Sequence, residues 1–181
     1  MKHIVRNALL SLGLVAVAQG AMAAGDATAG AAKAAVCGAC HGADGNSLVG
    51  TFPKLAGLGE KYLLKQLHDI QAWDLEQDAA KKATTGRKVP EMVGLLANLN
   101  DQDLADIAAH FAAQTMQLSG SKPLEVQVNS GLKVDALALG QRTYRAGNIA
   151  TGVPACTGCH TPDGKGNVAA GFPRLSGQHP E

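Results

Sequence analysis

The pentapeptide Cys-x-x-Cys-His occurs twice in this chain, as CGACH at residues 37–41 and as CTGCH at residues 156–160. This pattern is the attachment signal for c-type haem, in which two thiols form thioethers with the haem and the adjacent His reaches the iron. The two motifs use all four cysteines, so none is left for a disulfide framework. The repeat therefore predicts two covalently bound haem c groups. The predicted attachment residues are Cys37, Cys40, Cys156 and Cys159, and the predicted proximal iron ligands are His41 and His160.

Two other uses of paired cysteines fit the sequence less well. A structural zinc site needs a second Cys or His pair at finger spacing, and neither motif has one nearby. A thioredoxin-like redox pair lies in a βαβ pattern, which the flanking residues do not show. Electron transfer through haem is therefore the leading interpretation.

Residues 1–23 have the pattern of a secretory signal peptide. Two basic residues open the segment, residues 8–18 are apolar, and residues 21–23 read Ala-Met-Ala, which fits the small-x-small cleavage rule. The apolar stretch is short for a membrane span. We therefore expect cleavage between Ala23 and Ala24, with an uncleaved anchor as the alternative, and no later segment resembles a membrane helix.

Charge and composition agree with an exported haem protein. Loss of the segment would take the formal net charge from +1 to −1. A near-neutral chain lacks the basic footprint of a nucleic-acid-binding protein. Aromatic residues make up only 3% of the chain, and a haem would supply the large apolar surface that such a core lacks. Export predicts a periplasmic protein. It also supports the haem interpretation, because covalent haem is attached outside the bacterial cytoplasm, where an oxidising compartment would otherwise favour disulfides.

The two motifs belong to a longer internal repeat. Residues 37–46 match a segment 119 residues later, and FPKLAG at residues 52–57 matches FPRLSG at residues 172–177. Similarity in two blocks argues for duplication of a whole domain. By the same spacing, counterparts of the first domain's later helices would lie beyond residue 181. We therefore expect a C-terminally incomplete second domain, with a naturally shortened domain as the alternative.

Periodicity and capping residues predict an all-α fold. Asp26 is placed to cap a helix that runs into the first motif, and Gly30 inside that helix predicts a close helix crossing. Apolar residues recur at helical spacing over residues 60–73, and Asn100 is placed to cap a third helix. A further helix is expected from near Asp135. No stretch alternates convincingly as a strand.

The segment Ser-Gly-Ser-Lys-Pro from residue 119 is a linker signal. It separates two haem-binding units in the sequence. The predicted organisation is a signal peptide at residues 1–23, a first domain at 24–118, a linker at 119–134 and a second domain at 135–181.

Each iron needs a second axial ligand, and a methionine sulfur in that position raises the reduction potential. Beyond the predicted signal peptide the chain offers Met92 and Met116. Met92 lies 51 residues after His41, in a loop-like stretch before the Asn100 helix. Met92 is therefore the favoured ligand of the first haem, Met116 is the alternative, and core packing is the competing role for either.

The second haem has no methionine after it in the sequence. His179 follows His160 by 19 residues and is expected to lie on the surface rather than on the iron. Pro53 and Pro173 occupy matching places in the repeat. We expect their backbone carbonyls to accept a hydrogen bond from each proximal His ring, which would fix the ring tautomer; a plain turn is the alternative. Candidates to meet haem propionates are Tyr62, Trp73, Arg87 and Lys88, with a solvated face as the alternative for Arg87 and Lys88.

Taken together, these motifs resemble the dihaem cytochrome c4 family of periplasmic cytochromes. The resemblance covers essentially all of residues 24–181 and includes YLLKQL at residues 62–67, the pair Glu91-Met92 and GFPRL at residues 171–175. It implies two tandem cytochrome c-like domains related by pseudo-twofold symmetry, the second truncated here. It also implies His/Met coordination at both haems, with Met92 as the first-domain ligand, and electron delivery from a quinol-oxidising complex to a terminal oxidase.

The chain is therefore expected to be a periplasmic electron carrier rather than an enzyme. Its expected partners are redox proteins, with peripheral membrane association as an option and with no nucleic acid or small-molecule substrate. The alternative is a dihaem electron-accepting subunit of a larger redox enzyme, such as a sulfide-oxidising flavocytochrome. A dihaem peroxidase is a third interpretation, and it would need an open iron position.

Overall fold

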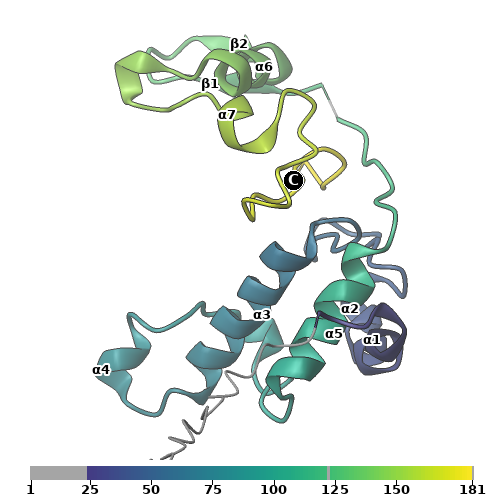
Figure 1. Ribbon diagram of the computed structural model, residues 1–181. Helices are drawn as coiled ribbons and strands as arrows, with labels where there is room; N and C mark the ends of the chain where they lie inside the picture. The colour runs from purple at the N-terminus through teal and green to yellow at the C-terminus, as the bar shows by residue number, and fades with distance from the viewer. Residues whose placement is uncertain (1–23, 122, 181) are drawn as a thin grey trace, which may run out of the picture.

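The computed structural model describes residues 24–121 and 123–180, which form short helices joined by loops (Figure 1). The predicted signal peptide lies outside the described residues. Within these residues, no helix is both long enough and apolar enough to cross a membrane. The first half contains α1 (Ala27–Lys33), η1 (Ala34–Val36), α2 (Gly38–His41), α3 (Glu60–Leu75), α4 (Ala79–Lys82), η2 (Pro90–Met92) and α5 (Asp101–Ala112). The second half contains β1 (Glu125–Gln127), β2 (Lys133–Asp135), α6 (Ala136–Ala146), η3 (Ile149–Thr151) and α7 (Thr157–His160).

The first half is organised around α5, which packs against both α1 and α3 (Figure 1). Asp26 caps α1 as predicted, because its carboxylate accepts hydrogen bonds from the backbone N–H groups of Thr28 and Ala29. Asn100 caps α5 as predicted and forms a reciprocal capping box with Asp103. These caps satisfy the free N–H groups of both helices and fix where each begins.

The apolar stripe of α5 forms the centre of the core. Leu104, Ile107 and Phe111 are each no more than 2% exposed, and their spacing places them on one side of the helix. The predicted helix from residue 60 is confirmed as α3, and it contributes Leu63 and Ile70 to the same core. The core therefore joins two helices that lie far apart in the sequence.

The predicted close crossing at Gly30 is confirmed. A Cβ atom there would lie 2.0 Å from the backbone oxygen of Asp106 on α5, so only glycine fits. The buried Asp106 carboxylate accepts hydrogen bonds from the Asp26 backbone N–H (2.8 Å), Lys33 Nζ (2.6 Å) and Gln102 Nε2 (2.8 Å). These bonds, above all the one from Asp26, lower the pKa of Asp106 to about 2. The crossing therefore holds a charged carboxylate at neutral pH.

A short hairpin opens the second half. β1 and β2 pair antiparallel, with Val126 opposite Val134. The expectation that the chain has no strand is therefore wrong. Each strand has only three residues and one partly buried side chain. Alternation is not visible over so few positions. The hairpin lies in the stretch predicted as a linker; the domain boundaries themselves stay predictions.

α6 begins where the sequence predicts a helix. Asp135 caps it by accepting hydrogen bonds from the backbone N–H groups of Leu137 and Ala138. No residue of α6 is buried. A Cβ atom on Gly140 would meet no atom within 4 Å. α6 is therefore far less enclosed than α1, although both precede a haem motif.

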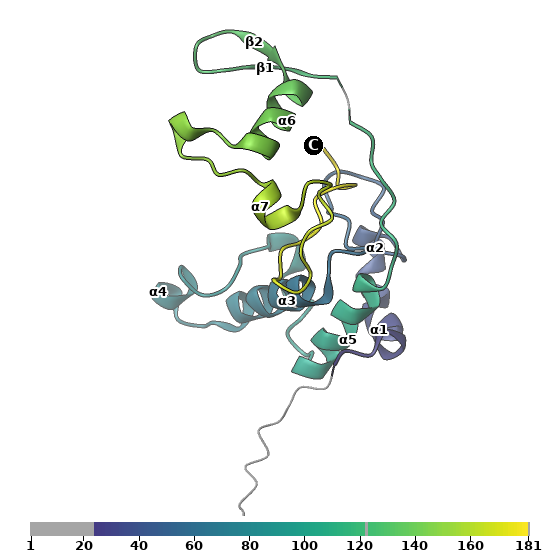
Figure 2. The ribbon, with the colours of Figure 1, turned by 45° about the horizontal axis from the view of Figure 1, so that its top comes forward.

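The chain after the second motif returns to the first domain. Lys61 Nζ, at the start of α3, donates to the backbone oxygen of Ala169 at 3.1 Å. A Cβ atom on Gly59 would approach the Val168 side chain to 3.3 Å. Figure 2 shows this C-terminal segment, in yellow, running beside α3. The two halves are thus joined by contacts as well as by the linker.

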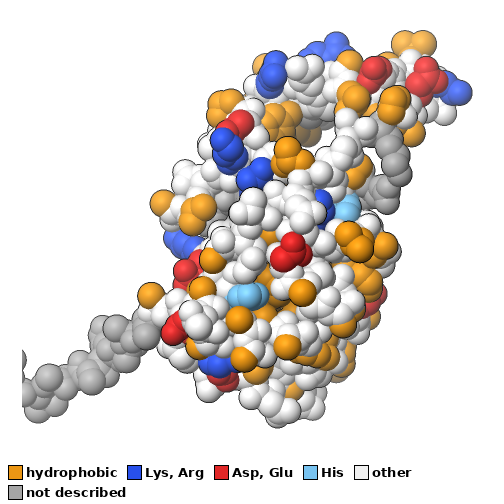
Figure 3. All heavy atoms as spheres, turned by 90° about the vertical axis from the view of Figure 1, so that its right-hand side faces the viewer, with side chains coloured by type: hydrophobic (Ala, Val, Ile, Leu, Met, Phe, Trp, Pro, Cys, Tyr) orange, Lys and Arg blue, Asp and Glu red, His pale blue; other side chains and the backbone are white. Residues whose placement is uncertain are grey.

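One face of the molecule shows how evenly the charges are spread. In Figure 3, hydrophobic side chains and charges of both signs are interspersed over the lower part of this face. This distribution agrees with a formal net charge close to zero. The face offers no broad single-sign surface of the kind that binds nucleic acid.

Substitution of Gly30 should test the α1–α5 crossing. We expect Gly30→Ala to destabilise the first domain by about 1–3 kcal/mol, because the added methyl overlaps backbone atoms of α5. Gly140→Ala is the matched control on α6; it should stabilise that helix by up to about 1 kcal/mol, since open space surrounds the site. Denaturant unfolding of the haem-loaded protein measures both changes. Equal effects of the two substitutions would contradict the crossing.

Candidate functional site

The first Cys-x-x-Cys-His motif forms one turn of helix. The backbone N–H groups of Cys40 and His41 both bond to the Cys37 oxygen, at 3.2 and 3.0 Å. Residues three and four positions apart share a helix face, so both cysteines and the histidine are presented together. Cys37 is half-buried, Cys40 is exposed and His41 is buried. The second motif repeats this turn in α7, with the same backbone pairing to Cys156.

Both histidine rings are held by the predicted proline carbonyls. His41 Nδ1 lies 2.8 Å from the Pro53 oxygen, and His160 Nδ1 lies 2.9 Å from the Pro173 oxygen. A carbonyl can only accept, so each Nδ1 carries the proton. The neutral ring then has an unprotonated Nε2, which is the form that binds a metal. The predicted hydrogen bonds to Pro53 and Pro173 are confirmed.

The loops that carry these carbonyls are also built alike. The Gly45 oxygen accepts hydrogen bonds from two successive N–H groups, those of Leu55 and Ala56. The Gly164 oxygen accepts the equivalent pair from residues 175 and 176. Phe52 lies edge-on to the His41 ring at 6.1 Å between centroids, and the matching pair in the second domain lies at 5.8 Å. The sequence repeat is therefore a repeat of geometry, down to single hydrogen bonds.

The environment of Cys37 argues against a thiol–disulfide active site. Burial raises the pKa of the Cys37 thiol. A reactive redox pair needs a lowered thiol pKa, because the thiolate is the nucleophile. The surroundings of the first motif therefore favour covalent attachment over redox chemistry at sulfur.

Met92 and Met116 lie in different surroundings. Met92 ends η2, is half-buried, and packs beside the apolar cluster formed by Ile70, Leu96 and Leu104. Gln71 on α3 fastens this loop, since its Nε2 donates to the backbone oxygens of residues 96 and 99, both at 2.7 Å. Met116 is only 5% exposed, and it belongs to the main core cluster. The structure therefore gives Met116 a packing role.

Three leucines connect the surroundings of Met92 with those of the first motif. Leu64, Leu67 and Leu99 pack against the cluster that Met92 borders and also against the cluster that Cys37 borders. The cysteine and the methionine thus share one apolar layer, which suits the flat apolar face of a haem. The assignment of Met92 as an iron ligand stays a prediction.

His179 lies between segments rather than on the open surface. Its Nε2 is 3.0 Å from the backbone oxygen of Ser47, and its Nδ1 is 3.4 Å from Ser119 Oγ. The ring is partly buried. The expectation of a surface histidine is therefore wrong. Both ring nitrogens have partners in the chain, which argues against an iron-ligand role.

Of the four side chains suggested as propionate partners, Trp73 and Lys88 lie together. Trp73 has Lys82 Nζ 4.2 Å and Lys88 Nζ 5.6 Å from its ring centroid, a cation–π arrangement. Arg87 donates to Gln66. Tyr62 packs against the core. The propionate role stays a prediction for all four.

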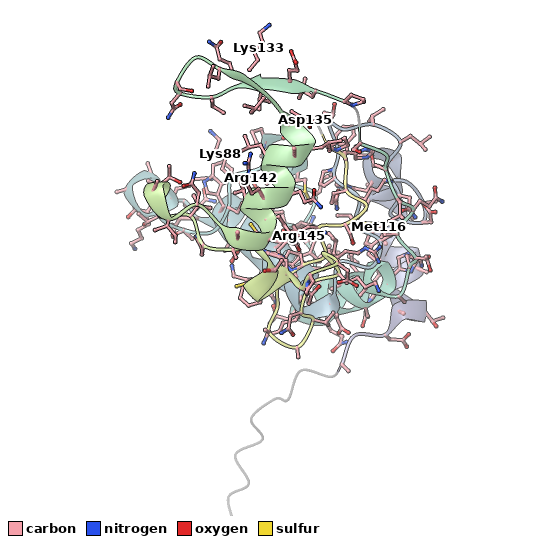
Figure 4. All side chains as sticks on the ribbon, turned by 90° about the horizontal axis from the view of Figure 1, so that it is seen from above. Lys88, Met116, Lys133, Asp135, Arg142 and Arg145 are labelled. Atoms are coloured by element: carbon pink, nitrogen blue, oxygen red, sulfur yellow. The ribbon has the colours of Figure 1, made fainter. Side chains whose placement is uncertain are left out.

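A shallow hollow of about 470 Å³ lies along α6. Arg142 and Arg145 line it, and Figure 4 shows both side chains on this helix. The other lining residues are Ala138, Gln141 and Ala146. All come from one helix and none from a haem motif, so the hollow is not the centre of the site.

The two motifs differ at the residue after the histidine. Gly42 has φ 81° and ψ 146°, and the equivalent Thr161 has φ 67° and ψ 158°. This region is almost reserved for glycine, and a β-branched residue there is strained. Tyr144 and Asp163 hold the strained residue: the tyrosine hydroxyl donates to the Thr161 oxygen at 2.7 Å, and the threonine hydroxyl donates to Asp163 at 2.7 Å.

The sequence alone did not point to Tyr144 or Asp163 as members of the site. The bond from Thr161, followed by those from Lys165, holds the pKa of the Asp163 carboxyl well below its usual range. The only available signal was the Thr161 side chain in the place of Gly42. The second motif therefore depends on supports that the first does not need.

The residues present fit a c-type haem at each motif. Each site combines two cysteines one turn apart with a histidine whose Nδ1 is held by a proline carbonyl and whose Nε2 is left free for the iron. A haem iron bound in this way supplies reversible one-electron chemistry. The chain's own part is to hold the ligand ring in one orientation and to cover the haem with apolar side chains.

Comparisons with known proteins agree with this reading of the site. The family model for cytochrome c matches residues 27–114. A cytochrome c4 from Pseudomonas aeruginosa is 52% identical over 179 residues, covering 99% of this chain and 76% of the relative. A crystal structure of reduced recombinant cytochrome c4 from Pseudomonas stutzeri is similar with a TM-score of 0.69 and 53% identity, over 86% of this chain and 75% of that one. A thiosulfate dehydrogenase electron acceptor from Stutzerimonas stutzeri is 32% identical over 146 residues, covering 80% of this chain and 58% of the relative.

The residue after each motif histidine gives a stability test. Gly42→Ala should destabilise the first domain by about 1–3 kcal/mol, because a Cβ atom would come within 2.9 Å of the Asn46 oxygen at positive φ. The reciprocal substitution Thr161→Gly relieves backbone strain but removes the hydrogen bonds of the hydroxyl. Because these two effects oppose each other, stability should change by less than about 1 kcal/mol. Denaturant unfolding followed by haem absorbance measures both. Losses of the same size would contradict the assigned asymmetry.

The two methionines give a test of ligation. Met92→Ala should weaken the methionine-to-iron absorption band of the oxidised protein and lower the potential of the first haem, because a thioether ligand favours ferrous iron. Met116→Leu is the matched control. It should retain the band and cost less than about 1.5 kcal/mol in stability, since the swap conserves volume in the core. An unchanged band in Met92→Ala would show that the first iron has another ligand.

Proposed function

The chain belongs to the cytochrome c4 family, and we propose that it carries electrons in the periplasm from a quinol-oxidising complex to a terminal oxidase. It is a dihaem electron-transfer cytochrome with two covalently bound haem c groups, and it is an electron carrier rather than an enzyme. Its all-α fold of two cytochrome c-like domains agrees with the expectation from the sequence. The partners and the compartment are the proposed part.

One observation carries the proposal most directly. Each histidine ring donates from Nδ1 to a proline carbonyl and keeps Nε2 free, and the same arrangement occurs twice in one chain. Such an outer hydrogen bond orients a metal-binding ring and raises its basicity. Two sites built alike suit a protein that only accepts and passes on electrons.

We assign a role to each site residue on this basis. Cys37 and Cys40 would hold the first haem, with His41 and Met92 as its axial ligands. In the second domain, Cys156, Cys159 and His160 would take the corresponding roles. A saturated iron binds no substrate and favours electron transfer over bond chemistry.

The proposed location follows from the sequence start and from the chemistry of haem attachment. Residues 1–23 have the pattern of an export signal. Membrane-bound respiratory complexes expose their cytochrome-docking surfaces on the periplasmic side, so docking would bring the protein to the membrane surface.

A second candidate is supported by one comparison. The chain is 32% identical to a thiosulfate dehydrogenase electron acceptor over 80% of its length. It could therefore accept electrons from an enzyme that oxidises an inorganic sulfur compound. The flavocytochrome alternative stays a prediction of the sequence alone.

Stopped-flow mixing of the haem-loaded protein with purified partners separates these candidates. We expect reduction by a quinol-oxidising complex, and oxidation by a terminal oxidase, with rate constants of about 10⁶ M⁻¹ s⁻¹ or more, typical of productive protein encounters. Reduction by a thiosulfate dehydrogenase alone would overturn the respiratory assignment and favour the second candidate. Met116→Leu serves as the control variant, since it alters the core without touching a proposed ligand.

A further inference from the structure

The side chain of Gln178, near the end of the described residues, forms hydrogen bonds with the backbone of the first domain. Gln178 Oε1 accepts a hydrogen bond from the Lys54 backbone N–H at 3.1 Å, and Gln178 Nε2 donates to the Lys54 backbone oxygen at 2.5 Å. One amide thus pairs with both polar groups of one residue, 124 positions away in the sequence. Figures 1 and 2 both show the C-terminal segment folding back toward the first domain.

Neighbouring contacts also stabilise this junction between the C-terminal segment and the first domain. Lys54 is only 5% exposed, and its Nζ donates to the backbone oxygen of Gln117. The Ser119 N–H donates to the Gly177 oxygen at 3.1 Å. The contact between His179 and the buried Ser47 closes the same junction. Three segments that are distant in sequence therefore meet around one lysine.

The hydrogen bonds of Gln178 act on His41, the proposed proximal ligand of the first haem, through a single peptide plane. The Pro53 carbonyl and the Lys54 N–H belong to the same planar unit. One edge of that plane accepts the hydrogen bond from His41 Nδ1 at 2.8 Å, and the other edge donates to Gln178. Because the unit is rigid, the side chain that holds the N–H also sets the direction of the carbonyl.

We propose that Gln178 is a positioning residue through which the second domain sets the orientation of the Pro53–Lys54 peptide and hence the properties of the first haem. The inference rests on the proposed ligation of iron by His41. A hydrogen bond at Nδ1 makes the ring a stronger electron donor to the metal. Docking of the second domain therefore strengthens that donation and holds the first reduction potential down.

The coupling runs in one direction. In the internal repeat, Gln178 matches Leu58, because each follows the matching Phe-Pro-x-Leu-x-Gly segments. A leucine has no polar atom with which to grip the Pro173–Arg174 peptide of the second domain. Leu58 is instead part of the first domain's core. The second domain thus tunes the first haem, and within residues 24–121 and 123–180 no side chain holds the Pro173–Arg174 peptide in the same way.

The test compares Gln178→Leu with the wild-type haem-loaded protein. In the variant, we expect the first-haem potential to rise and that of the second haem to stay unchanged in a spectroelectrochemical titration. In the reduced protein, the His41 Nδ1 proton should exchange with solvent about fivefold faster, the factor that corresponds to one ordinary net hydrogen bond. Gln77→Leu, the same change at an exposed glutamine of the first domain, should alter neither quantity.

A conservative variant tests which atom matters. Gln178→Glu keeps an oxygen acceptor for the Lys54 N–H but loses the Nε2 donor to the Lys54 oxygen, so the His41 proton should exchange less than fivefold faster than in the wild type; exchange fivefold faster or more in this variant would overturn the proposal. It also provides the test should Gln178→Leu fail to fold. Wild-type exchange and potential in Gln178→Leu would likewise overturn it. Loss of histidine ligation in the wild-type spectrum would instead sink the proposed function, so the two failures are distinguishable.

Discussion

The structure depends on one hydrogen bond that is made twice, from a histidine Nδ1–H to a proline carbonyl. In each domain it ties the helical turn of the motif to the Phe-Pro loop, at 2.8 Å for His41 and 2.9 Å for His160. It selects the tautomer, and it leaves the metal-binding nitrogen free. In each domain, two backbone N–H groups of the following loop donate to one glycine oxygen and support the loop. The protein backbone therefore orients each histidine ring independently of the iron.

Much of this arrangement is local in the sequence and could be predicted from it. The caps at Asp26, Asn100 and Asp135 are short-range signals, and each helix begins where its cap predicts. Glycine destabilises the interior of a helix, so its presence at position 30 predicted a close helix crossing, and the structure shows one. The proline carbonyls were predictable because the repeat places a Phe-Pro pair after each motif, with Pro53 12 residues after His41 and Pro173 13 residues after His160. The roles of the cysteines and of Met92 rest on motif chemistry, and they stay predictions.

The remaining features depend on contacts that leave no periodic pattern. His179 meets Ser47 across 132 residues, and nothing in its neighbours indicates a buried junction. The hairpin pairs strands of three residues, too short to alternate visibly. Tyr144 supports Thr161 from a helix that otherwise looks merely amphipathic. His179 and Tyr144 each bond through a side chain to a backbone group of another segment, and such partners can be identified only once the chain is folded.

The duplication gives both haems the same frame of motif turn, histidine and proline carbonyl, so differences between the haems arise from the residues around these groups. Thr161 replaces a glycine and needs two side-chain supports, which makes the second frame the more strained. Gln178 replaces a leucine and reaches across to the first frame. Identical ligands in different surroundings titrate at different potentials, because hydrogen bonds and burial around the ligand tune the metal. A two-domain carrier built in this way can separate its potentials without changing a single residue that binds haem.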